Sequence, residues 1–299
     1  MILTFDVGGT SIKSALYQAD GTLVRDLASR PTAIYPDDNA ILSQLLAWIR
    51  EEQSALGKEA IQGVAIATAG AVNPYTGEIV FSGPTIPRYI GTPIRQTIEE
   101  ELGILCSVEN DVNAMALGEA WLGAAKGLHS ALCITLGTGL GGALLMGDKL
   151  WHGVNFSAGE IGHYPIQRKN SEPKRFEELA ATTALLRDYQ ERTGQAIDGK
   201  ALFAKVAQGD EMAIASLEGL IEEIAWGLLP VLYTFAPQAL IVGGGISEQP
   251  QHLEARLQSA LLRVAQHPRL VPEVIRCATL GNRANQLGAL RWFKDLHNR

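Results

Sequence analysis

The sequence has few cysteines, fewer basic than acidic residues and no long apolar run, and each of these features excludes a class of protein. Three cysteines in 299 residues are too few and too widely spaced for a disulfide framework. No run approaches the ~20 apolar residues that a membrane span needs. The net charge of −7 argues against nucleic acid or an anionic membrane as a main partner, since these bind clustered Lys and Arg. We therefore expect a soluble cytoplasmic enzyme with reduced thiols.

The chain is also too long for one ordinary core, and its length fits two domains. No basic region precedes the apolar residues at its start, and Asp6 interrupts them early. This start predicts a β-strand, not a signal peptide.

Two segments, 2–17 and 131–146, share an order of apolar strand, glycine turn and second strand. Superimposing Gly8 on Gly137 aligns both hairpins and nearly aligns the turns at their far ends. The pattern predicts an internal duplication with a long period.

Between and after these hairpins, apolar runs alternate with helical periodicity, which predicts an α/β protein with sheets covered by helices. Two such units facing one another would leave a cleft, where ligands usually bind. The further predicted strands are 64–68, 105–108 and 239–242, and the predicted helices are 38–56, 114–125, 177–193, 199–207, 211–235 and 285–296.

The first glycine turn carries groups suited to phosphate. Gly8 and Gly9 let the backbone N–H groups approach an anion, and Thr10 and Lys13 add a hydroxyl and an amine. Asp6 would be repelled by phosphate unless Mg²⁺ lay between them. The alternative is an ordinary hairpin turn with a surface lysine.

The second glycine turn, 137–142, matches G-x-G-x-x-G, but a strand follows it where a dinucleotide-binding site requires a helix. A third run, 243–245, leaves a buried strand and offers bare backbone to a flat ring or ribose; the alternative is a tight strand-to-helix connection. The predicted nucleotide contacts of these two runs are Gly137, Thr138, Gly139, Gly243, Gly244 and Gly245.

A carboxylate suited to general base catalysis follows the strand 105–108. Asp111 opens a helix, where the N-terminal dipole favours the ionised form. The alternative is that Asn110 or Asp111 only caps this helix. Further along, Glu160 and His163 are three residues apart and face the same way on a helical turn, where they offer an acceptor and a donor to neighbouring hydroxyls. The alternative is a surface or structural pair.

The glycine segments in this order resemble the sugar kinase, Hsp70 and actin superfamily, and within it the ROK family (repressors, open reading frames and sugar kinases). The resemblance covers nearly the whole chain. Its motifs are Phe-Asp-Val-Gly-Gly-Thr at 5–10, Glu-Asn-Asp-Val-Asn-Ala at 109–114, Leu-Gly-Thr-Gly-Leu-Gly-Gly at 136–142, Gly-Glu-Ile-Gly-His at 159–163 and Val-Gly-Gly-Gly-Ile at 242–246.

The resemblance implies two RNase H-like (actin-like ATPase) domains that close on ATP, Mg²⁺ and a hexose. Residues 1–118 with 285–299 would form the smaller domain, and 119–284 the larger. Asp111 corresponds to the family's catalytic base. Homodimers are a family expectation. The residues that correspond to the family's sugar contacts are Asn110, Glu160, His163 and Glu178.

The sequence departs from the family at two places. Many ROK proteins follow the histidine with a Cys-rich zinc motif, whereas residues 164–176 contain no cysteine, so we predict no structural zinc. Thr85 stands where family kinases often have a sugar-binding Asn, and Tyr89 replaces a nearby Trp. Zinc-less relatives include kinases of N-acetylmannosamine and of β-glucosides, and both substrates stay open beside glucose.

The leading hypothesis is phosphorylation of the 6-hydroxyl of a hexose or N-acetylhexosamine. The main alternative is a sugar-responsive ROK regulator or sensor without kinase activity. Family repressors carry a DNA-binding helix-turn-helix before the first phosphate loop, whereas five residues precede Asp6 here and the net charge is acidic. Retention of Asp6, Lys13, Asp111 and both glycine loops favours a kinase over a silent sensor.

Overall fold

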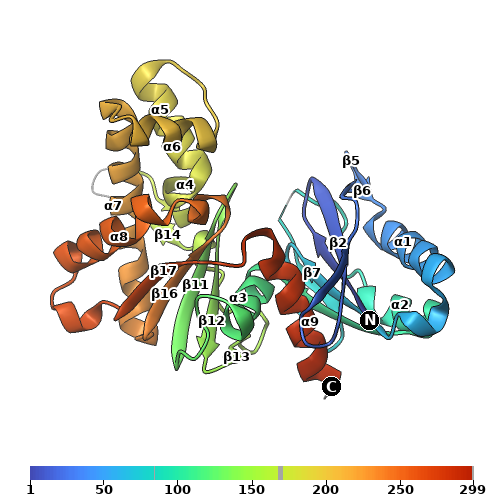
Figure 1. Cartoon of the computed structure of the whole chain (residues 1–299). Coiled ribbons are helices and arrows are strands. Elements are labelled where there is room, and N and C mark those ends of the chain that lie inside the picture. The colour runs from blue at the N-terminus through green and yellow to red at the C-terminus, as the bar shows by residue number, and fades with distance from the viewer. Residues whose placement is uncertain (84, 168–170, 298–299) are drawn as a thin grey trace. The chain divides into compact units, whose positions relative to one another are not determined.

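The computed structural model describes residues 1–83, 85–167 and 171–297, and the chain divides into two compact units (Figure 1). From the sequence, we expected the first unit to end at residue 118 and to resume at 285. The contacts between residues instead end it at 121 and resume it at 282. The predicted division did not assign 152–157 to the first unit. Unit 1 comprises Met1–Trp121, His152–Ser157 and Asn282–Arg299, and unit 2 comprises Leu122–Trp151 and Ala158–Gly281.

Unit 1 is built on a sheet with the strand order β10-β7-β1-β2-β3. β1 (Ile2–Val7) pairs antiparallel with β2 (Ser11–Tyr17) across the first glycine turn, and β2 pairs with β3 (Leu23–Asp26). On its other edge β1 pairs in parallel with β7 (Gly63–Thr68), and β7 pairs in parallel with β10 (Leu105–Asn110). The sheet therefore joins an antiparallel meander to two parallel strands.

Unit 2 repeats this arrangement in the order β17-β16-β11-β12-β13. β11 (Ser130–Leu136), β12 (Leu140–Met146) and β13 (Lys149–Leu150) form the meander. β16 (Ala239–Gly243) and β17 (Val274–Cys277) continue it in parallel. The predicted duplication is confirmed, because the two sheets share strand order and direction.

In unit 1 the predicted helix 38–56 begins at Ile41, since residues 38–39 pair with 34–35 instead. The pattern also missed the hairpin of β8 and β9, at 71–81, and the helix α2, at 94–102. The remaining elements of unit 1 are β4 (Arg30–Pro31), β5 (Ile34–Tyr35), β6 (Asp38–Asn39), α1 (Ile41–Leu56), η1 (Lys58–Ala60), β8 (Ala71–Asn73), β9 (Glu78–Phe81), α2 (Ile94–Leu102), α3 (Asp111–Leu122), η5 (Gly281–Arg283) and α9 (Ala284–His297).

In unit 2 the predicted helix 177–193 is wrong as one element, because the extended backbone of Ala181 divides it. The break directs the N–H of Thr182 to the carbonyl of Gly137, so α5 begins against the second glycine turn. The remaining elements of unit 2 are η2 (Ile161–His163), β14 (Pro165–Ile166), β15 (Lys174–Arg175), α4 (Phe176–Ala180), α5 (Thr182–Thr193), α6 (Gly199–Ala207), α7 (Glu211–Phe235), η3 (Gly245–Glu248), α8 (Pro250–Val264) and η4 (Pro268–Leu270).

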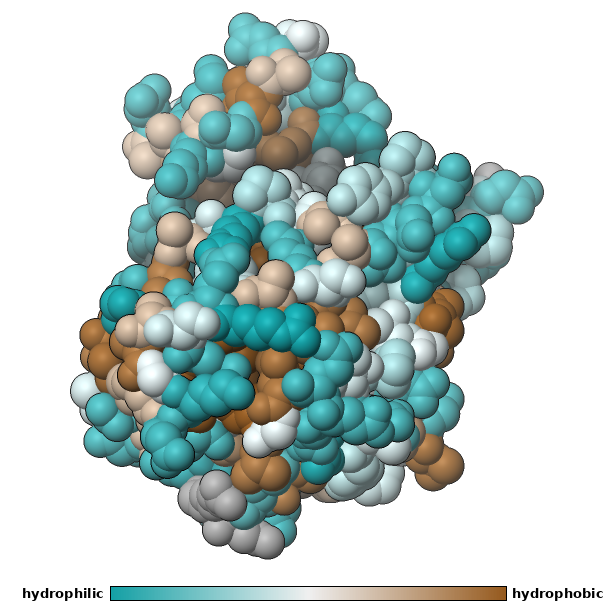
Figure 2. Space-filling view, turned by 90° about the vertical axis from the view of Figure 1, so that its right-hand side faces the viewer, coloured by the Kyte–Doolittle hydropathy of each residue, from teal (hydrophilic) through white to brown (hydrophobic). Residues whose placement is uncertain are grey.

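Each unit has its own apolar core. In unit 1, Trp48 of α1 packs edge-on against Phe5 of β1 with ring centroids 5.4 Å apart, and α9 contacts β1, β7 and β10. On the side of unit 1 that carries α1 and α2, hydrophobic residues lie in separate spots among polar ones (Figure 2). None of the helices within the described ranges combines the length and apolarity of a membrane span.

The close packing of α3 against α9 depends on glycine. A Cβ at Gly288 would lie 1.6 Å from the carbonyl oxygen of Ala114, and one at Gly118 would lie 2.4 Å from that of Ala284. These contacts bring the C-terminal helix against the helix that Asp111 begins.

Gly288→Ala is expected to lower the free energy of unfolding by about 1–3 kcal/mol, because the added methyl group must push the two helices apart. Urea unfolding followed by circular dichroism measures the change. Gly219→Ala is the matched control, since Gly219 is also helical but has no atom within 4 Å of an added Cβ. Equal midpoints for the two variants would contradict the packing argument.

Candidate active site

The first glycine turn places a carboxylate beside backbone N–H groups. Asp6 lies near the end of β1 and accepts a hydrogen bond from Asn285 Nδ2 at 3.0 Å. Burial raises the pKa of Asp6, and Asn285 and Lys13 partly offset that rise. Lys13 Nζ contacts Asn282 Oδ1 at 3.0 Å. Sequence reasoning missed both asparagines, because their 269 or more residues of separation leave no local signal.

Asp111 leaves the same edge of the sheet as this turn. Val7 is in register with Thr68 on β7, and Thr68 is in register with Asn110 on β10. The ends of β1 and β10 are therefore two strand spacings apart, about 10 Å. The carboxyl edge of parallel strands is the usual position of ligand sites in open α/β sheets. The structure thus brings the predicted base and the first phosphate turn to one edge of unit 1.

Hydrogen bonds fix the turn that carries Asp111. Asn110 Oδ1 accepts from the N–H groups of Val112 and Asn113 at 2.9 and 3.0 Å, so Asn110 does cap α3. Its Nδ2 donates to Gly70 O and to Asp111 Oδ1, both at 3.0 Å. Asp111 is partly exposed, and its Oδ1 also accepts from Val112 N at 2.9 Å. The capping interpretation therefore applies to Asn110, and Asp111 has an oriented carboxylate.

Tyr89 lies behind this turn and is fully buried, so its ring is no surface platform for a sugar. Its hydroxyl lies 2.7 Å from Thr68 Oγ1 at the end of β7. Burial raises the pKa of Tyr89, and the charge of Asp111 raises it further. Thr85 lies in an exposed turn, and its contact with sugar stays a prediction.

In unit 2 the second and third glycine runs lie together. Thr135 of β11 is in register with Gly243 of β16, so both strands deliver glycines to one edge. Gly244 has φ +84°, and a Cβ there would lie 2.3 Å from the carbonyl oxygen of Leu136. That approach requires glycine. The bare backbone of 243–245 is thereby held beside the turn 137–139.

The segment 159–163, which we call the sugar loop, lies against β12. A Cβ at Gly159 (φ +94°) would lie 2.3 Å from Gly142 O, and one at Gly162 would lie 2.0 Å from Leu140 O. Glu160 Oε2 and His163 Nε2 are 3.5 Å apart, which confirms that they face the same way. Burial raises the pKa of Glu160, while His163 lowers it. The loop therefore presents an acid and an imidazole together.

Glu177, not Glu178, is the second carboxylate at this loop. Glu177 Oε1 lies 3.9 Å from His163 Nδ1, and a Cβ on Gly139 would lie 2.8 Å from Glu177 Oε2. Glu178 is exposed and accepts from the N–H of Arg175 at 2.8 Å, and this bond lowers its pKa. The predicted position is thus occupied by a helix-capping residue. The family resemblance had assigned this role to Glu178, one residue away, where the surrounding sequence has diverged from the family.

Within the described ranges, no cluster of three or more His, Cys, Asp or Glu has an arrangement that holds a metal ion. The three cysteines, Cys106, Cys133 and Cys277, are buried. Part of the segment on which the zinc prediction rests, 168–170, lies outside the described residues. The absence of a structural zinc stays a prediction.

Comparison with known proteins identifies the family. The ROK family model matches residues 2–296. The β-glucoside kinase of Listeria monocytogenes is 30% identical and covers 100% of this chain and 99% of its own. The glucokinase of Streptomyces coelicolor is 31% identical over 95% of this chain and 94% of its own. The Streptomyces griseus ROK glucokinase, solved with glucose and AMPPNP, has a TM-score of 0.81 at 28% identity over 97% and 98% of the two chains. The chain belongs to the ROK family and has its actin-like ATPase fold.

Proposed function

We propose that this ROK family member, an ATP-dependent sugar kinase, transfers the γ-phosphoryl group to the 6-hydroxyl of a hexose or N-acetylhexosamine. The observation that carries the proposal is the oriented Asp111 carboxylate on the sheet edge that also bears the first glycine turn. Phosphoryl transfer needs an aligned nucleophile and neutralised charge more than covalent catalysis. Asp111 aligns the nucleophile, and the N–H groups of the glycine turns neutralise part of the phosphate charge.

Asp111 acts as the general base. The hydrogen bonds to Oδ1 fix the orientation of the Asp111 carboxylate. The carboxylate aligns the sugar hydroxyl and accepts the hydroxyl proton as the hydroxyl oxygen attacks phosphorus. Glu160, His163 and Glu177 bind other hydroxyls of the sugar, with Glu177 replacing Glu178 in this role. Carboxylates and imidazole suit this task because each hydroxyl can donate to one and accept from another.

The nucleotide is ATP with Mg²⁺. The backbone N–H groups of 8–10 and 137–139 hold phosphate oxygens, and the bare backbone of 243–245 lies against the adenosine. Asp6 fits a place near Mg²⁺, because a buried carboxylate whose pKa is raised is stabilised by a nearby cation. When bound, Mg²⁺ neutralises charge on the phosphates. A cytoplasmic location is supported by two features. The proposed reaction consumes ATP, and the three cysteines are buried free thiols.

Glucose, N-acetylmannosamine and β-glucosides are the candidate sugars. The decisive experiment is a coupled ADP-release screen over glucose, mannose, fructose, N-acetylmannosamine, N-acetylglucosamine and cellobiose, with ATP and with or without Mg²⁺. Turnover with at least one sugar is expected only when Mg²⁺ is present, and NMR of the product locates the phosphate. No turnover with any sugar would favour a sensor, and a phosphate on another hydroxyl would refute the 6-hydroxyl assignment.

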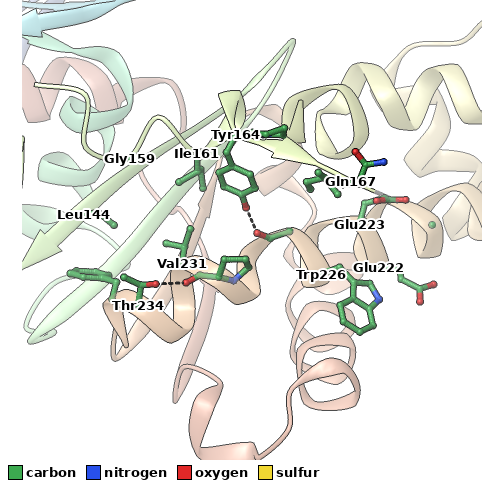
Figure 3. Close-up of a pocket in the computed structure, with 16 residues that line it drawn as sticks. Leu144, Gly159, Ile161, Tyr164, Gln167, Glu222, Glu223, Trp226, Val231 and Thr234 are labelled. Atoms are coloured by element: carbon green, nitrogen blue, oxygen red, sulfur yellow. Dashed lines mark hydrogen bonds between the residues drawn. The ribbon is translucent and has the colours of Figure 1, made fainter. Parts of the chain in front are cut away.

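We also propose that the protein forms a homodimer through an apolar groove of unit 2. The groove has a volume of about 1100 Å³ and lies between α7 and the segments around β12 and β14 (Figure 3). Trp226 is 55% exposed there, and the hydroxyl of Tyr164 donates to Gly227 O on its floor. Exposed apolar grooves with aromatic side chains are typical of protein interfaces.

Trp226→Glu is expected to convert the dimer to a monomer at micromolar concentration, because it places a charge in the interface. Sedimentation equilibrium measures the mass. Leu262→Glu on α8 is the control, since Leu262 is also exposed but does not line the groove, and it should stay dimeric. A monomeric wild type would refute the dimer and leave the groove to a small apolar ligand.

A further inference from the structure

The carboxylate of Glu109 is fully buried one residue before Asn110, and both of its oxygens are engaged. Oε1 accepts from the N–H of Asn110 at 2.8 Å and from Asn113 Nδ2 at 3.0 Å. Oε2 lies 2.7 Å from His152 Nε2. A carboxylate oxygen accepts, which assigns the ring proton to Nε2. A buried carboxylate is retained at a cost in solvation, so each of these partners matters to its position.

His152 begins a segment with an unusual course. Residues 152–157, which we call the strap, belong to unit 1, whereas the chain on either side belongs to unit 2. The His152 ring is 5.4 Å from Trp292 of α9, and Phe156 is 6.3 Å from Tyr75. The strap is thus held to unit 1 by one buried hydrogen bond and a group of aromatic contacts.

The strap is also strained at its far end. Phe156 has φ +61°, a left-handed conformation that costs a non-glycine residue roughly 1–3 kcal/mol. Strain of this kind persists only where the surroundings impose it. Three residues later the chain reaches Gly159 and the sugar loop, where the backbone packs closely against β12. The strap, which His152 anchors in unit 1, therefore directly precedes in sequence the segment that carries the sugar loop.

We propose that Glu109 and His152 form a positioning pair for phosphoryl transfer. Through Oε1, Glu109 fixes the turn that carries Asp111; through Oε2 and His152, it anchors the strap that leads into the sugar loop. One buried carboxylate thereby holds both the base and the chain before the sugar contacts. The proposal rests on the proposed roles of Asp111 and Glu160. Neither member of the pair touches reacting atoms.

Two substitutions separate the hydrogen bond from the ring. His152→Phe keeps the aromatic contacts and removes the donor, whereas His152→Gln places an amide N–H near the position of Nε2. His152→Phe is expected to lower kcat by about 10–100-fold, because small displacements of catalytic groups carry penalties of this order. His152→Gln is expected to recover most of that loss. The KM for ATP is expected to stay unchanged in both, since the hydrogen bonds and ring contacts described for the pair go to Asn110, Asn113, Tyr75 and Trp292, none of which we assign to the nucleotide.

Tyr17→Phe is the control for a purely structural effect. It removes the 3.2 Å hydrogen bond from Tyr17 to Gln286, which is also buried in unit 1, and is expected to lower the melting temperature with kcat unchanged. If His152→Phe does not fold, the double variant Glu109→Gln/His152→Phe replaces it, because that variant leaves no unpaired buried charge.

Three results would overturn the proposal: wild-type kcat in His152→Phe or in the double variant, a His152→Gln variant as impaired as His152→Phe, or an equal loss of kcat in Tyr17→Phe. Asp111→Asn is measured in the same assay. If Asp111→Asn loses activity and His152→Phe does not, the positioning pair alone fails. If Asp111→Asn keeps its rate, the base assignment fails instead.

Discussion

Asp111→Asn is expected to lower kcat by about 10²–10⁴-fold, with little change in the KM for sugar or ATP. The range is the usual contribution of a positioned general base. Asparagine has the same shape, and its Oδ1 still accepts from the N–H of Val112, so the start of α3 should be preserved. What the variant lacks is the ability to take the proton from the attacking hydroxyl. Steady-state kinetics with the preferred sugar measure the effect.

The matched control for this substitution is Asp210→Asn. Asp210 is also an aspartate at a helix start, where its Oδ1 accepts from the N–H groups of Met212 and Ala213 at 3.0 and 2.9 Å. It is expected to change stability slightly and kcat not at all. A full rate in Asp111→Asn would show that Asp111 is another helix-start residue and that a different group accepts the proton.

Glu177→Gln is expected to raise the KM for sugar by about 10–100-fold, because a hydrogen bond to a charged group contributes about 1.5–3 kcal/mol. Glu178→Gln, one residue along the chain, should leave the KM within about twofold, since its carboxylate is exposed and caps the helix start at the Arg175 N–H. Both glutamates pair with the Arg175 guanidinium, so the difference rests on the position of Glu177 beside His163 and Gly139. The neighbours share chemistry and helix, so the comparison isolates position. Isothermal titration with the sugar separates binding from turnover.

The opposite result, a large effect at Glu178 and none at Glu177, would restore the assignment made from the sequence pattern. Equal, small effects at both would remove the second carboxylate from the sugar site. In that case Glu160 and His163 would carry the hydroxyl contacts of the sugar loop without it.

Much of the fold was predictable because its signals are local. Each glycine hairpin has apolar strands on both sides of a turn, and the long helix α7 matches its predicted range of 211–235. The break at Ala181 was not predictable, because no Gly or Pro marks it and the next residue, Thr182, donates its N–H to Gly137, 45 residues before Thr182. A local sequence pattern contains no information about a hydrogen-bond acceptor that lies far away in the sequence.

For the same reason, some residues of the candidate site could be predicted from the sequence and others could not. Asp6, Asp111 and the glycines were found because they end strands, and strand ends have a local pattern. Glu177, Asn285 and the pair of Glu109 with His152 were missed, since each depends on a contact between segments that are distant in sequence or on a choice between equivalent neighbours. The missed residues have no local sequence pattern of their own.

The shared topology of the two sheets allows the residues at their equivalent strand ends to be compared. The equivalent of β10, which delivers Asp111, is β17. β17 ends at Cys277, and Ala278, Thr279 and Leu280 follow without a carboxylate. Both copies kept a glycine turn, but one alone carries an acid at the third strand end. The two sheets therefore share the glycine turn to which we assign phosphate binding, whereas the acid that we propose as the base follows this strand in unit 1 and not in unit 2.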